Sequence, residues 1–349
     1  MGPFQMDRPA LVMNRLLALS LMAFFVVVAV RFHGRRDADP VRIIHRLRPK
    51  ALWGAALRLA PFALVPIVLG SSLGVMISRG EGSEAAKKKA HDYWKQNIAT
   101  WKDAPQPEIV DVDLKLKLDP AKSHFATEGR FTLSNPHDAP LKRFALTGGF
   151  HWGEAKWTLN GKEYKPENRT SLCAFTPVTP MASGDTVVVG FSFEGNLPKG
   201  ISKNGGGAGE FILPSGVVLT AFGPSFVPEV GYDEEIGIEQ DKNFYESRVY
   251  PDDFYVGRTV PAFGSGSAFT ARVEVSGPAE YRYNSIGVLE SEKVDGGVRT
   301  AVWKTDRKVR MFNVVAGKWA ERKGEGTAIY YHPAHTYNID ELALAMNGA

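Results

Sequence analysis

The sequence predicts two transmembrane α-helices plus a mainly-β soluble domain, built from antiparallel sheets in a sandwich-like or saddle-like arrangement. Three observations lead to this fold class. Two long runs without a charged residue lie within the first 78 residues. From residue 109 apolar and polar residues alternate with a period of two, as in strands with one buried face. Turn-forming residues then separate many short apolar segments, which is typical of an all-β domain.

The two uncharged runs cover residues 16–30 and 59–77. Each is close to the roughly 20 residues that cross a bilayer. A cleaved signal peptide is the alternative for the first run, but arginine-rich sequence follows it and no small-residue cleavage site does. Pro61 and Pro66 lie inside the second run, and membrane helices tolerate proline where neighbouring helices satisfy the freed carbonyls. We therefore expect two spans, with membrane lipid and further membrane helices as partners.

The charges around these runs predict the orientation. The connector between them carries eight positive charges: Arg31, Arg35, Arg36, Arg42, Arg46, Arg48, Lys50 and Arg58. Only two precede the first run, and five lie in residues 79–95. Because positively charged loops stay in the cytoplasm, the connector should be cytoplasmic. The protein is thus expected in the cell inner membrane, with its soluble domain extracytoplasmic.

The composition argues against a nucleic-acid partner and against disulfides. The net charge of the 349 residues is +4, but residues 1–78 hold ten Lys or Arg and three Asp. That balance of +7 leaves −3 for the remainder, so the basic excess flanks the membrane and no nucleic-acid binding is expected. Cys173 is the single cysteine, and its apolar surroundings predict core packing rather than a reactive thiol.

The chain divides into four parts. Residues 1–79 are predicted to form the transmembrane helical hairpin, and residues 80–104 a charged juxtamembrane helix and linker, with the helix at 80–102. Residues 105–326 are predicted to form the β domain, and 327–349 return to a helical pattern at 339–346. Strands are expected at 109–118, 125–133, 141–147, 155–159, 186–193, 216–222, 269–275, 299–304, 310–316 and 327–331.

No complete catalytic site is visible in the sequence. His332 and His335 resemble a metal pair, but Pro333 between them favours a capped turn, and no His-Glu-x-x-His motif occurs. The glycine-rich stretch 204–209 lacks the lysine of a phosphate-binding loop. The acid pairs are adjacent residues, which point to opposite faces of a strand, so solvated loop charges are expected at Glu234, Glu235, Asp252 and Asp253.

Several stretches resemble the aminopeptidase N family of zinc metallopeptidases. Val-Asp-Val-Asp-Leu-Lys-Leu-Lys-Leu-Asp-Pro at 110–120 and Glu-Gly-Arg-Phe-Thr-Leu-Ser-Asn at 128–135 are similar to its opening strands. Residues 221–228, 269–278 with 283–285, 305–319 and 329–333 are similar to later family segments, in the same order. Tyr-Trp-Lys-Gln-Asn at 93–97 and Gly-Val-Val-Leu at 216–219 resemble a bacterial branch in which the peptidase follows the helices of an ABC-type permease.

The resemblance implies that this chain forms the structural scaffold of a peptidase but lacks its catalytic residues. The family's metal ligands, general base and substrate-amine glutamates belong to a catalytic domain expected beyond Ala349, so residues 327–349 would be the start of a truncated catalytic domain. No catalytic, cofactor-binding or metal residue is expected in this chain, and zinc would bind only in the missing domain. Some members add a Gln or Glu from the β domain, but the stretch 214–219 has neither. A peptide would be a substrate only of the full-length enzyme.

Three hypotheses of the function follow. The first is the membrane-anchoring, cleft-forming N-terminal part of a membrane-bound aminopeptidase, not catalytic by itself. The second is a membrane-tethered, non-enzymatic β module that binds a protein partner or a permease. The third is a transporter subunit, which would need partner chains because two helices form no transport path. Under the first hypothesis the final helix has little to pack against, and residues after about Tyr337 should be frayed or loosely placed.

Overall fold

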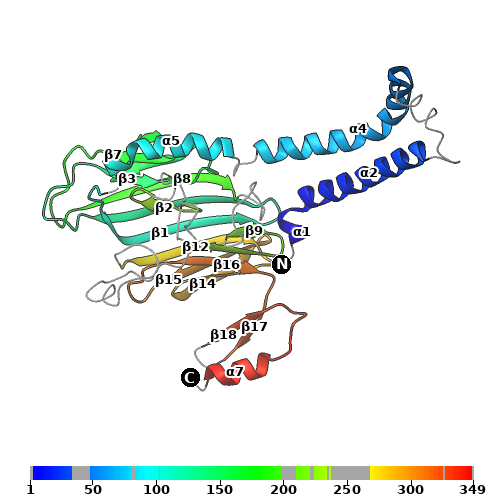
Figure 1. The fold of residues 1–349 in the computed structure, drawn as a ribbon. Helices are drawn as coiled ribbons and strands as arrows, with labels where there is room; N and C mark the ends of the chain where they lie inside the picture. Colours follow the sequence, from blue (N-terminus) through cyan, green and yellow to red (C-terminus); the bar gives the residue numbers. More distant parts are fainter. Residues whose placement is uncertain are drawn as a thin grey trace, which may run out of the picture. The chain divides into compact units, whose positions relative to one another are not determined.

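The computed structural model describes residues 3–33, 48–79, 84–101, 103–197, 210–220, 224–233, 236, 268–324 and 327–347. The chain divides into two compact units. One is Met1–Ala85 with Lys199–Gly205, and the other is Ala86–Pro198 with Gly206–Ala349. The predicted fold class is confirmed: the first unit contains two long apolar helices, and the second consists mainly of strands (Figure 1).

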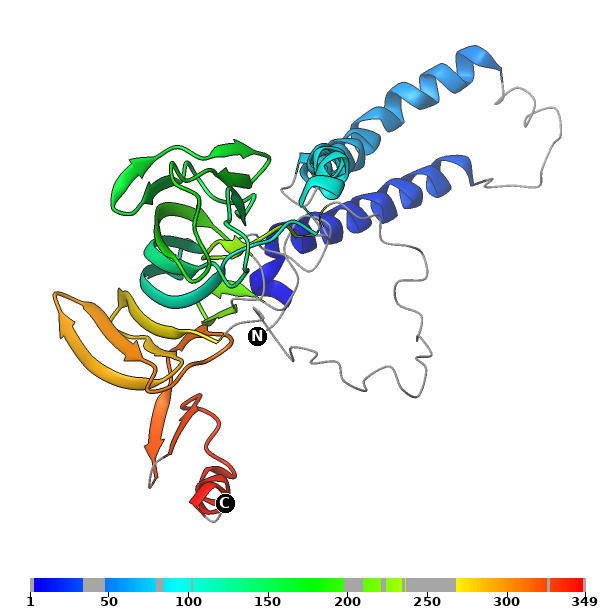
Figure 2. The same ribbon diagram turned by 90° about the vertical axis from the view of Figure 1, so that its left-hand side faces the viewer.

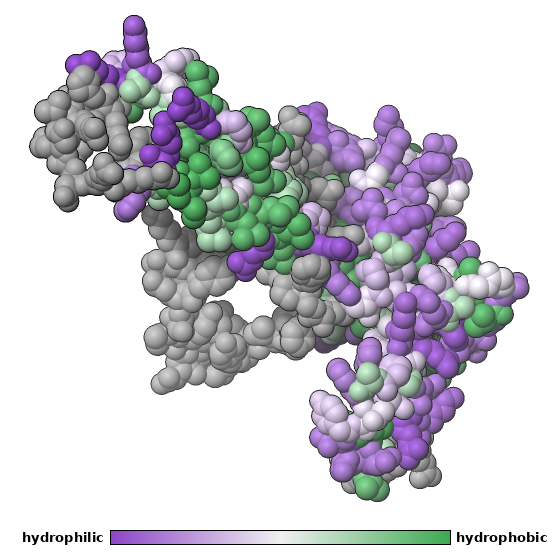
Figure 3. All heavy atoms as spheres, turned by 90° about the vertical axis from the view of Figure 1, so that its right-hand side faces the viewer, coloured by the Kyte–Doolittle hydropathy of each residue, from purple (hydrophilic) through white to green (hydrophobic). Residues whose placement is uncertain are grey.

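The first unit is helical. Its described elements are α1 (Pro3–Met6), α2 (Arg8–Phe32) and α4 (Pro49–Arg79). Segments of α2 and α4, Arg8–Arg31 and Pro49–Ile77, are long and apolar enough to cross a membrane. Many of their large apolar side chains are exposed to the surroundings, and Figure 3 shows this apolar surface gathered over the two helices. Exposed apolar helices of this length are what a bilayer would cover.

The two long helices pack against each other. Gly70 of α4 faces Leu17 of α2: a Cβ added at Gly70 would lie 3.8 Å from Leu17 Cδ1, an ordinary van der Waals contact. Pro61 and Pro66 lie within α4, which continues through both, and Pro66 is buried. Additional membrane helices stay a prediction.

The second unit begins near the start of α5 (Glu84–Trp101), which falls inside the predicted helix 80–102. Residues 80–83 and 102 of that prediction lie outside the described residues. The largest sheet has eight strands in the order β14-β15-β12-β1-β2-β8-β4-β5. Its strands are β1 (Glu108–Asp119), β2 (His124–Ser134), β4 (Lys156–Leu159), β5 (Lys162–Tyr164), β8 (Thr186–Asn196), β12 (Thr270–Pro278), β14 (Val288–Asp295) and β15 (Val298–Lys304).

The described strands form three smaller sheets besides this one. One has the order β13-β16-β10-β9 and another the order β11-β3-β7-β6, while β17 and β18 pair only with each other among the described strands. Their bounds are β3 (Phe144–Thr147), β6 (Glu167–Arg169), β7 (Leu172–Phe175), β9 (Phe211–Leu213), β10 (Gly216–Thr220), β11 (Glu229–Val230), β13 (Arg282–Ser285), β16 (Asn313–Gly317), β17 (Ala320–Lys323) and β18 (Ala328–Tyr331).

Alternation along β1 divides the eight-stranded sheet into a dry and a wet face. Val112, Leu114, Leu116 and Leu118 are buried in the core, whereas the residues between them are charged and at least partly exposed. A single hydrophobic core joins this dry face to the two four-stranded sheets, and in it Phe144 of β3 stacks on Phe175 of β7. The period of two thus places the core as the sequence predicts.

The pairing of β1 differs in one respect from the expected antiparallel strand. β1 pairs antiparallel with β2, but on its other side it pairs parallel with β12, Asp111–Lys117 against Thr270–Ser276. All other pairs of described strands are antiparallel. A parallel neighbour needs a long connection, and here the whole chain from β2 to β11 provides it.

Helix α5 packs against the β11-β3-β7-β6 sheet. Trp94 and Trp101 are buried there against Ala145, Leu172 and Ala174. The indole Nε1 of Trp94 donates to the carbonyl of Thr170 at 3.0 Å, and the hydroxyl of Tyr232 donates to the carbonyl of Trp94 at 2.6 Å. In Figures 1 and 2 the helix lies beside this sheet. The C-terminal half of α5 is therefore an integral layer of the β unit.

The C-terminal segment forms a helix but buries little. α7 (Ile339–Asn347) is regular rather than frayed, which differs from the expectation. Its apolar side chains stay exposed, with Leu342 at 50%, Leu344 at 73% and Met346 at 41% of their full accessibility. One ion pair, from Arg322 of β17 to Asp340 at 3.2 Å, joins it to the β17–β18 hairpin. A helix this short, with its apolar side chains exposed, is only marginally stable by itself.

We expect that truncation after Pro333 leaves the melting temperature of the β unit nearly unchanged. The deletion removes α7, whose apolar side chains are exposed, and one surface ion pair, which typically contributes about 1 kcal/mol or less. Thermal unfolding of the purified full-length and truncated proteins measures the difference. A loss of several degrees would show that the tail stabilises the unit after all.

Candidate functional site

The histidine pair considered as a metal site forms a turn. His332 and His335 are exposed, and their ring centroids lie 5.2 Å apart. The backbone N–H of Ala334 donates to His332 Nδ1 at 3.2 Å, and that of His335 donates to the His332 carbonyl at 2.8 Å. Both contacts of His332 are therefore with the backbone of its own turn. The geometry is that of the capped turn that Pro333 favours.

No group of three or more potential metal ligands occurs among the residues that the structure describes. Several sequence candidates fall outside them: the glycine-rich stretch 204–209, Glu234, Glu235, Asp252 and Asp253. Cys173 lies on β7 with 2% of its surface exposed, and burial raises the pKa of its thiol to about 12. The thiol stays protonated at neutral pH and packs in the core, as predicted.

A hollow of about 770 Å³ opens where β4 and β5 meet β6 and β7. Its walls include the turn after β3, at Gly148 and Gly149, and the crossover from β5 to β6. Side chains of Trp157, Tyr164 and Cys173 also line it. Its size suits a small molecule. Its charged residues, however, have both signs and lie on exposed positions, and no acid–base pair converges in it: Glu154, Lys156, Glu163 and Lys165.

The segment 224–228, which resembles a family loop, is fixed by three side chains from elsewhere in the unit. The carbonyl of Ser225 accepts from Trp152 Nε1 at 2.6 Å and from His151 Nε2 at 2.8 Å. The hydroxyl of Thr127 on β2 donates to the carbonyl of Phe226 at 2.9 Å. Burial lowers the pKa of His151, so the ring is neutral at pH 7 and donates from Nε2. These contacts hold the loop in one conformation.

Glu210 is a partly buried carboxylate that belongs to no recognisable sequence motif. It stands just before β9, and its Oε1 accepts from the backbone N–H of Thr220 at 2.6 Å and from the Thr220 hydroxyl at 3.0 Å. The contact closes the open end of the β9–β10 hairpin. Burial raises the pKa of Glu210, and its hydrogen bonds to Thr220 oppose this only in part. No ion pair to it occurs among the described residues, so its charge is costly to bury.

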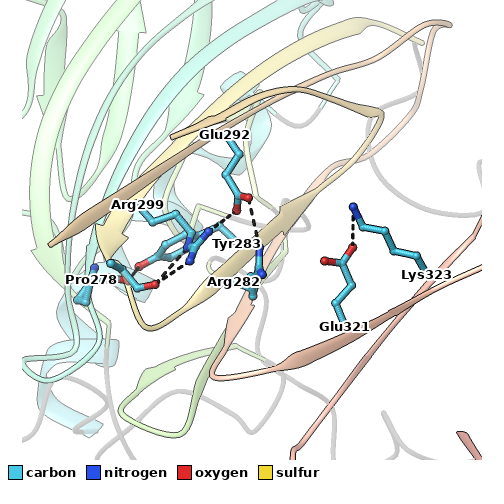
Figure 4. Close-up of polar contacts among 8 residues, drawn as sticks. Pro278, Arg282, Tyr283, Glu292, Arg299, Glu321 and Lys323 are labelled. Carbon is cyan, nitrogen blue, oxygen red and sulfur yellow. Dashed lines mark hydrogen bonds and ion pairs between the residues drawn. The ribbon is translucent and has the colours of Figure 1, made fainter. Parts of the chain in front are cut away.

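A cluster of charged side chains joins three elements near the C-terminal hairpin (Figure 4). Glu292 of β14 lies between Arg299 of β15, at 2.9 Å, and Arg282 of β13, at 3.2 Å. Arg299 also donates from Nε and Nη2 to the carbonyl of Ala279, each at 3.1 Å. The cluster therefore ties the edge of the eight-stranded sheet to the β13-β16-β10-β9 sheet.

The charges of this cluster affect the pKa of Tyr330 on the β17–β18 hairpin. Burial raises the pKa of Tyr330 on β18, the carboxylates of Glu321 and Glu292 raise it further, and the charge of Arg282 lowers it. Tyr330 also contacts Trp319, with ring centroids 5.9 Å apart. Charge-paired carboxylates and guanidinium groups of this kind position elements; none is arranged as a nucleophile with a base.

Replacing Glu210 with glutamine should raise the melting temperature more at pH 8 than at pH 4. The raised pKa means that the folded state binds the proton of Glu210 more tightly than the unfolded state does. The stability that this proton contributes is fully present below the unfolded-state pKa and is lost as the pH rises through the folded-state pKa. The amide of the Glu210→Gln variant stays neutral at both pH values, and its oxygen still accepts from Thr220.

Thermal melts of the wild type and Glu210→Gln at both pH values measure this effect, with Glu163→Gln as the matched control because Glu163 is exposed on β5. The control should shift the melting temperature little at either pH. An equal shift of Glu210→Gln at pH 4 and pH 8, or a loss at pH 8, would contradict the assignment.

Comparisons with known proteins found similarity only at the level of structure. No family model matches the sequence, and no curated protein matches it. The M1 zinc metallopeptidase from Deinococcus radiodurans is similar over 68% of this chain and 52% of its own, at 15% identity and a TM-score of 0.45. The Legionella pneumophila aminopeptidase A in complex with aspartic acid is similar over 70% of this chain and 26% of its own, at 14% identity and a TM-score of 0.45. The chain thus spans about half the length of the first of these structures, and about a quarter of the second.

Proposed function

We propose that this chain is the membrane-anchoring and cleft-forming part of a membrane-bound zinc aminopeptidase and performs no catalysis by itself. One observation carries the proposal. Segments that resemble the aminopeptidase N family occur in the family's order along the chain, and most of their residues lie on helices and strands of a mainly-β unit: 93–97 on α5, 110–119 on β1, 128–134 on β2, 216–219 on β10, 270–278 on β12, 283–285 on β13, 313–317 on β16 and 329–331 on β18. The family order of these segments, together with the mainly-β fold, supports the proposal.

The β17–β18 hairpin and α7 support the same proposal. The hairpin pairs with no further strand among those described, and α7 presents Leu342, Leu344 and Met346 to the surroundings. Free strand edges beside an apolar helix are surfaces that another domain normally covers. In this proposal a catalytic peptidase domain covers them, and it supplies the zinc ligands and the general base. The permease-type helices of the bacterial branch would provide the membrane neighbours of α2 and α4.

The 349-residue protein should therefore bind no stoichiometric zinc and hydrolyse no aminoacyl chromogenic substrate. A catalytic zinc site needs three protein ligands in fixed geometry, and neither the sequence motifs nor the described residues provide such a set. Metal analysis and an activity assay on chelator-washed, zinc-repleted protein measure both properties. One tight zinc per chain, or steady hydrolysis, would contradict the proposal.

The coding sequence beyond codon 349 separates the proposal from a non-enzymatic membrane-tethered module. A His-Glu-x-x-His motif with a downstream glutamate supports the aminopeptidase, because two histidines one helical turn apart and a glutamate base form its zinc centre. An immediate stop codon supports the module.

The β unit should lie outside the cytoplasm, in the proposed inner-membrane location. Eight positive charges in the connector between α2 and α4 disfavour its translocation, and α4 is long enough to cross the bilayer. Protease added to intact spheroplasts should digest the β unit and spare the connector. Lysed spheroplasts are the control, in which both are accessible. Protection of the β unit in intact spheroplasts would reverse the orientation.

A further inference from the structure

Strand β14 forms an open edge of the eight-stranded sheet. It stands at the end of the strand order (Figure 1), and among the described strands it pairs only with β15. All eight of its residues are exposed. Three of them are large and apolar: Val288, Leu289 and Val294, at 61%, 41% and 53% of their full accessibility. The opposite edge, β5, has only three residues. Because an edge strand presents unpaired N–H and C=O groups, β14 can accept a further strand.

The charges on β14 restrict which strand can pair with it. Of the four charged residues, Glu292 is held by Arg282 and Arg299, and Glu290 lies 3.7 Å from Arg272. Charged side chains on an edge disfavour pairing with an unrelated strand. They do not disfavour a strand that places an opposite charge at each position, since such cross-strand pairs are stabilising.

A second copy of β14 is such a strand. In an antiparallel pair in which Glu290 lies opposite Lys293 of the second copy, Leu289 lies opposite Val294 of the second copy. The twofold symmetry of a homodimer repeats both pairs, so the contact contains two opposite-charge pairs and two apolar pairs.

The faces of the strand agree with this register. Leu289 pairs with Trp303 and Val294 with Arg299 on β15, and these two β15 positions are four apart, so both apolar residues are on one face. Lys293 pairs with Thr300. The carboxylate of Glu290 lies 3.7 Å from Arg272 of β12, and Arg272 pairs with Lys304 of β15. Because positions 300 and 304 of β15 are four apart, Lys293 and Glu290 both lie on the other face of the sheet.

The centre of this contact joins like charges. Because of the register shift between Leu289 and Ser291, Glu290 and Ser291 together lie opposite Lys293 of the second copy, and Glu292 lies opposite Glu292 of the second copy at the twofold axis. Arg282 and Arg299 hold Glu292 within each copy and so reduce the repulsion between the two carboxylates.

From these observations we propose that β14 is a dimer contact, in which it pairs antiparallel with β14 of a second copy of this chain. Main-chain hydrogen bonds would join the two eight-stranded sheets edge to edge, and the Glu290–Lys293 pairs would set the register. The proposal does not rest on the peptidase assignment. One pair of strands is a small interface, so the dimer should be weak in solution and be favoured where both copies are confined to one membrane.

The test exchanges the charges of this pair in the full chain, purified in a density-matched detergent, and measures the dimer dissociation constant by sedimentation equilibrium. E290K places Lys opposite Lys293, and K293E places Glu opposite Glu290, so each variant alone should dimerise about tenfold more weakly than the wild type or worse. An equimolar mixture of the two variants regains opposite charges at both pairs. It should therefore form heterodimers with close to the wild-type dissociation constant.

The matched controls are E128K and K115E, alone and mixed. Lys115 of β1 and Glu128 of β2 are also opposite one another and exposed, but they lie on strands with two neighbours. These variants should dimerise as the wild type does. Val294→Lys provides a test that leaves the contact of Glu290 with Arg272 intact, and it should also weaken the dimer because it places Lys opposite Leu289.

Several results would overturn the proposal. The first is a wild type that stays monomeric at every concentration measured, and the second is a dimer that neither charge exchange nor Val294→Lys weakens. The third is a mixture of E290K and K293E that stays monomeric. The fourth is a loss of dimer affinity in the control variants as large as that in E290K and K293E. A dimer held only by the membrane helices would not be weakened by the charge exchanges or by Val294→Lys. Thermal melts of each variant show that the comparison is made between folded proteins.

Discussion

The parallel pairing of β1 with β12 is the contact on which the β unit depends. It joins Asp111–Lys117 to Thr270–Ser276, segments separated by most of the domain. On the dry face Leu114 lies opposite Val273, and both side chains are fully buried. On the wet face Asp113 lies between Arg130 at 2.8 Å and Arg272 at 3.6 Å. Apolar burial supplies the free energy and also selects the register, because a slip by one residue would turn the apolar side chains of one strand to the wet face.

The long strands with one buried face are predicted from sequence with nearly correct bounds, whereas the fully exposed β14 and several short strands are not predicted. β1, β2, β8 and β12 alternate apolar and polar residues, and their predicted bounds differ from the observed ones by three residues or fewer. β14 is not predicted because all eight of its residues are exposed, so its positions do not alternate between buried and exposed. β5, β6 and β7 have three or four residues each, too few to show a period. Which strand becomes the second neighbour of β1 depends on packing across the whole domain and leaves no local pattern.

The residues of the candidate site divide in the same way. Local signals are sufficient for Cys173, whose apolar neighbours predict burial, and for the turn at His332, where Pro333 disfavours a continuing helix. Glu210 has no such signal, because its partner Thr220 is ten residues away and across a hairpin whose first strand has only three residues. Likewise, the contact of His151 with the carbonyl of Ser225 joins segments 74 residues apart. Side chains whose role is set by distant backbone groups need the fold to be known first.

The position of β12 in the chain also sets an order of events during synthesis. β12 begins roughly 150 residues after β1 ends. At about 5–20 residues per second, β1 leaves the ribosome some 8–30 s before the strand that will cover its second edge. In that interval β1 can pair with β2, and β2 with β8, but its other side is an open strand edge. Lys115 and Lys117 on the wet face make that edge a poor template for other chains. The alternating charges of β1 therefore protect the nascent chain from aggregation as well as solvating the finished sheet.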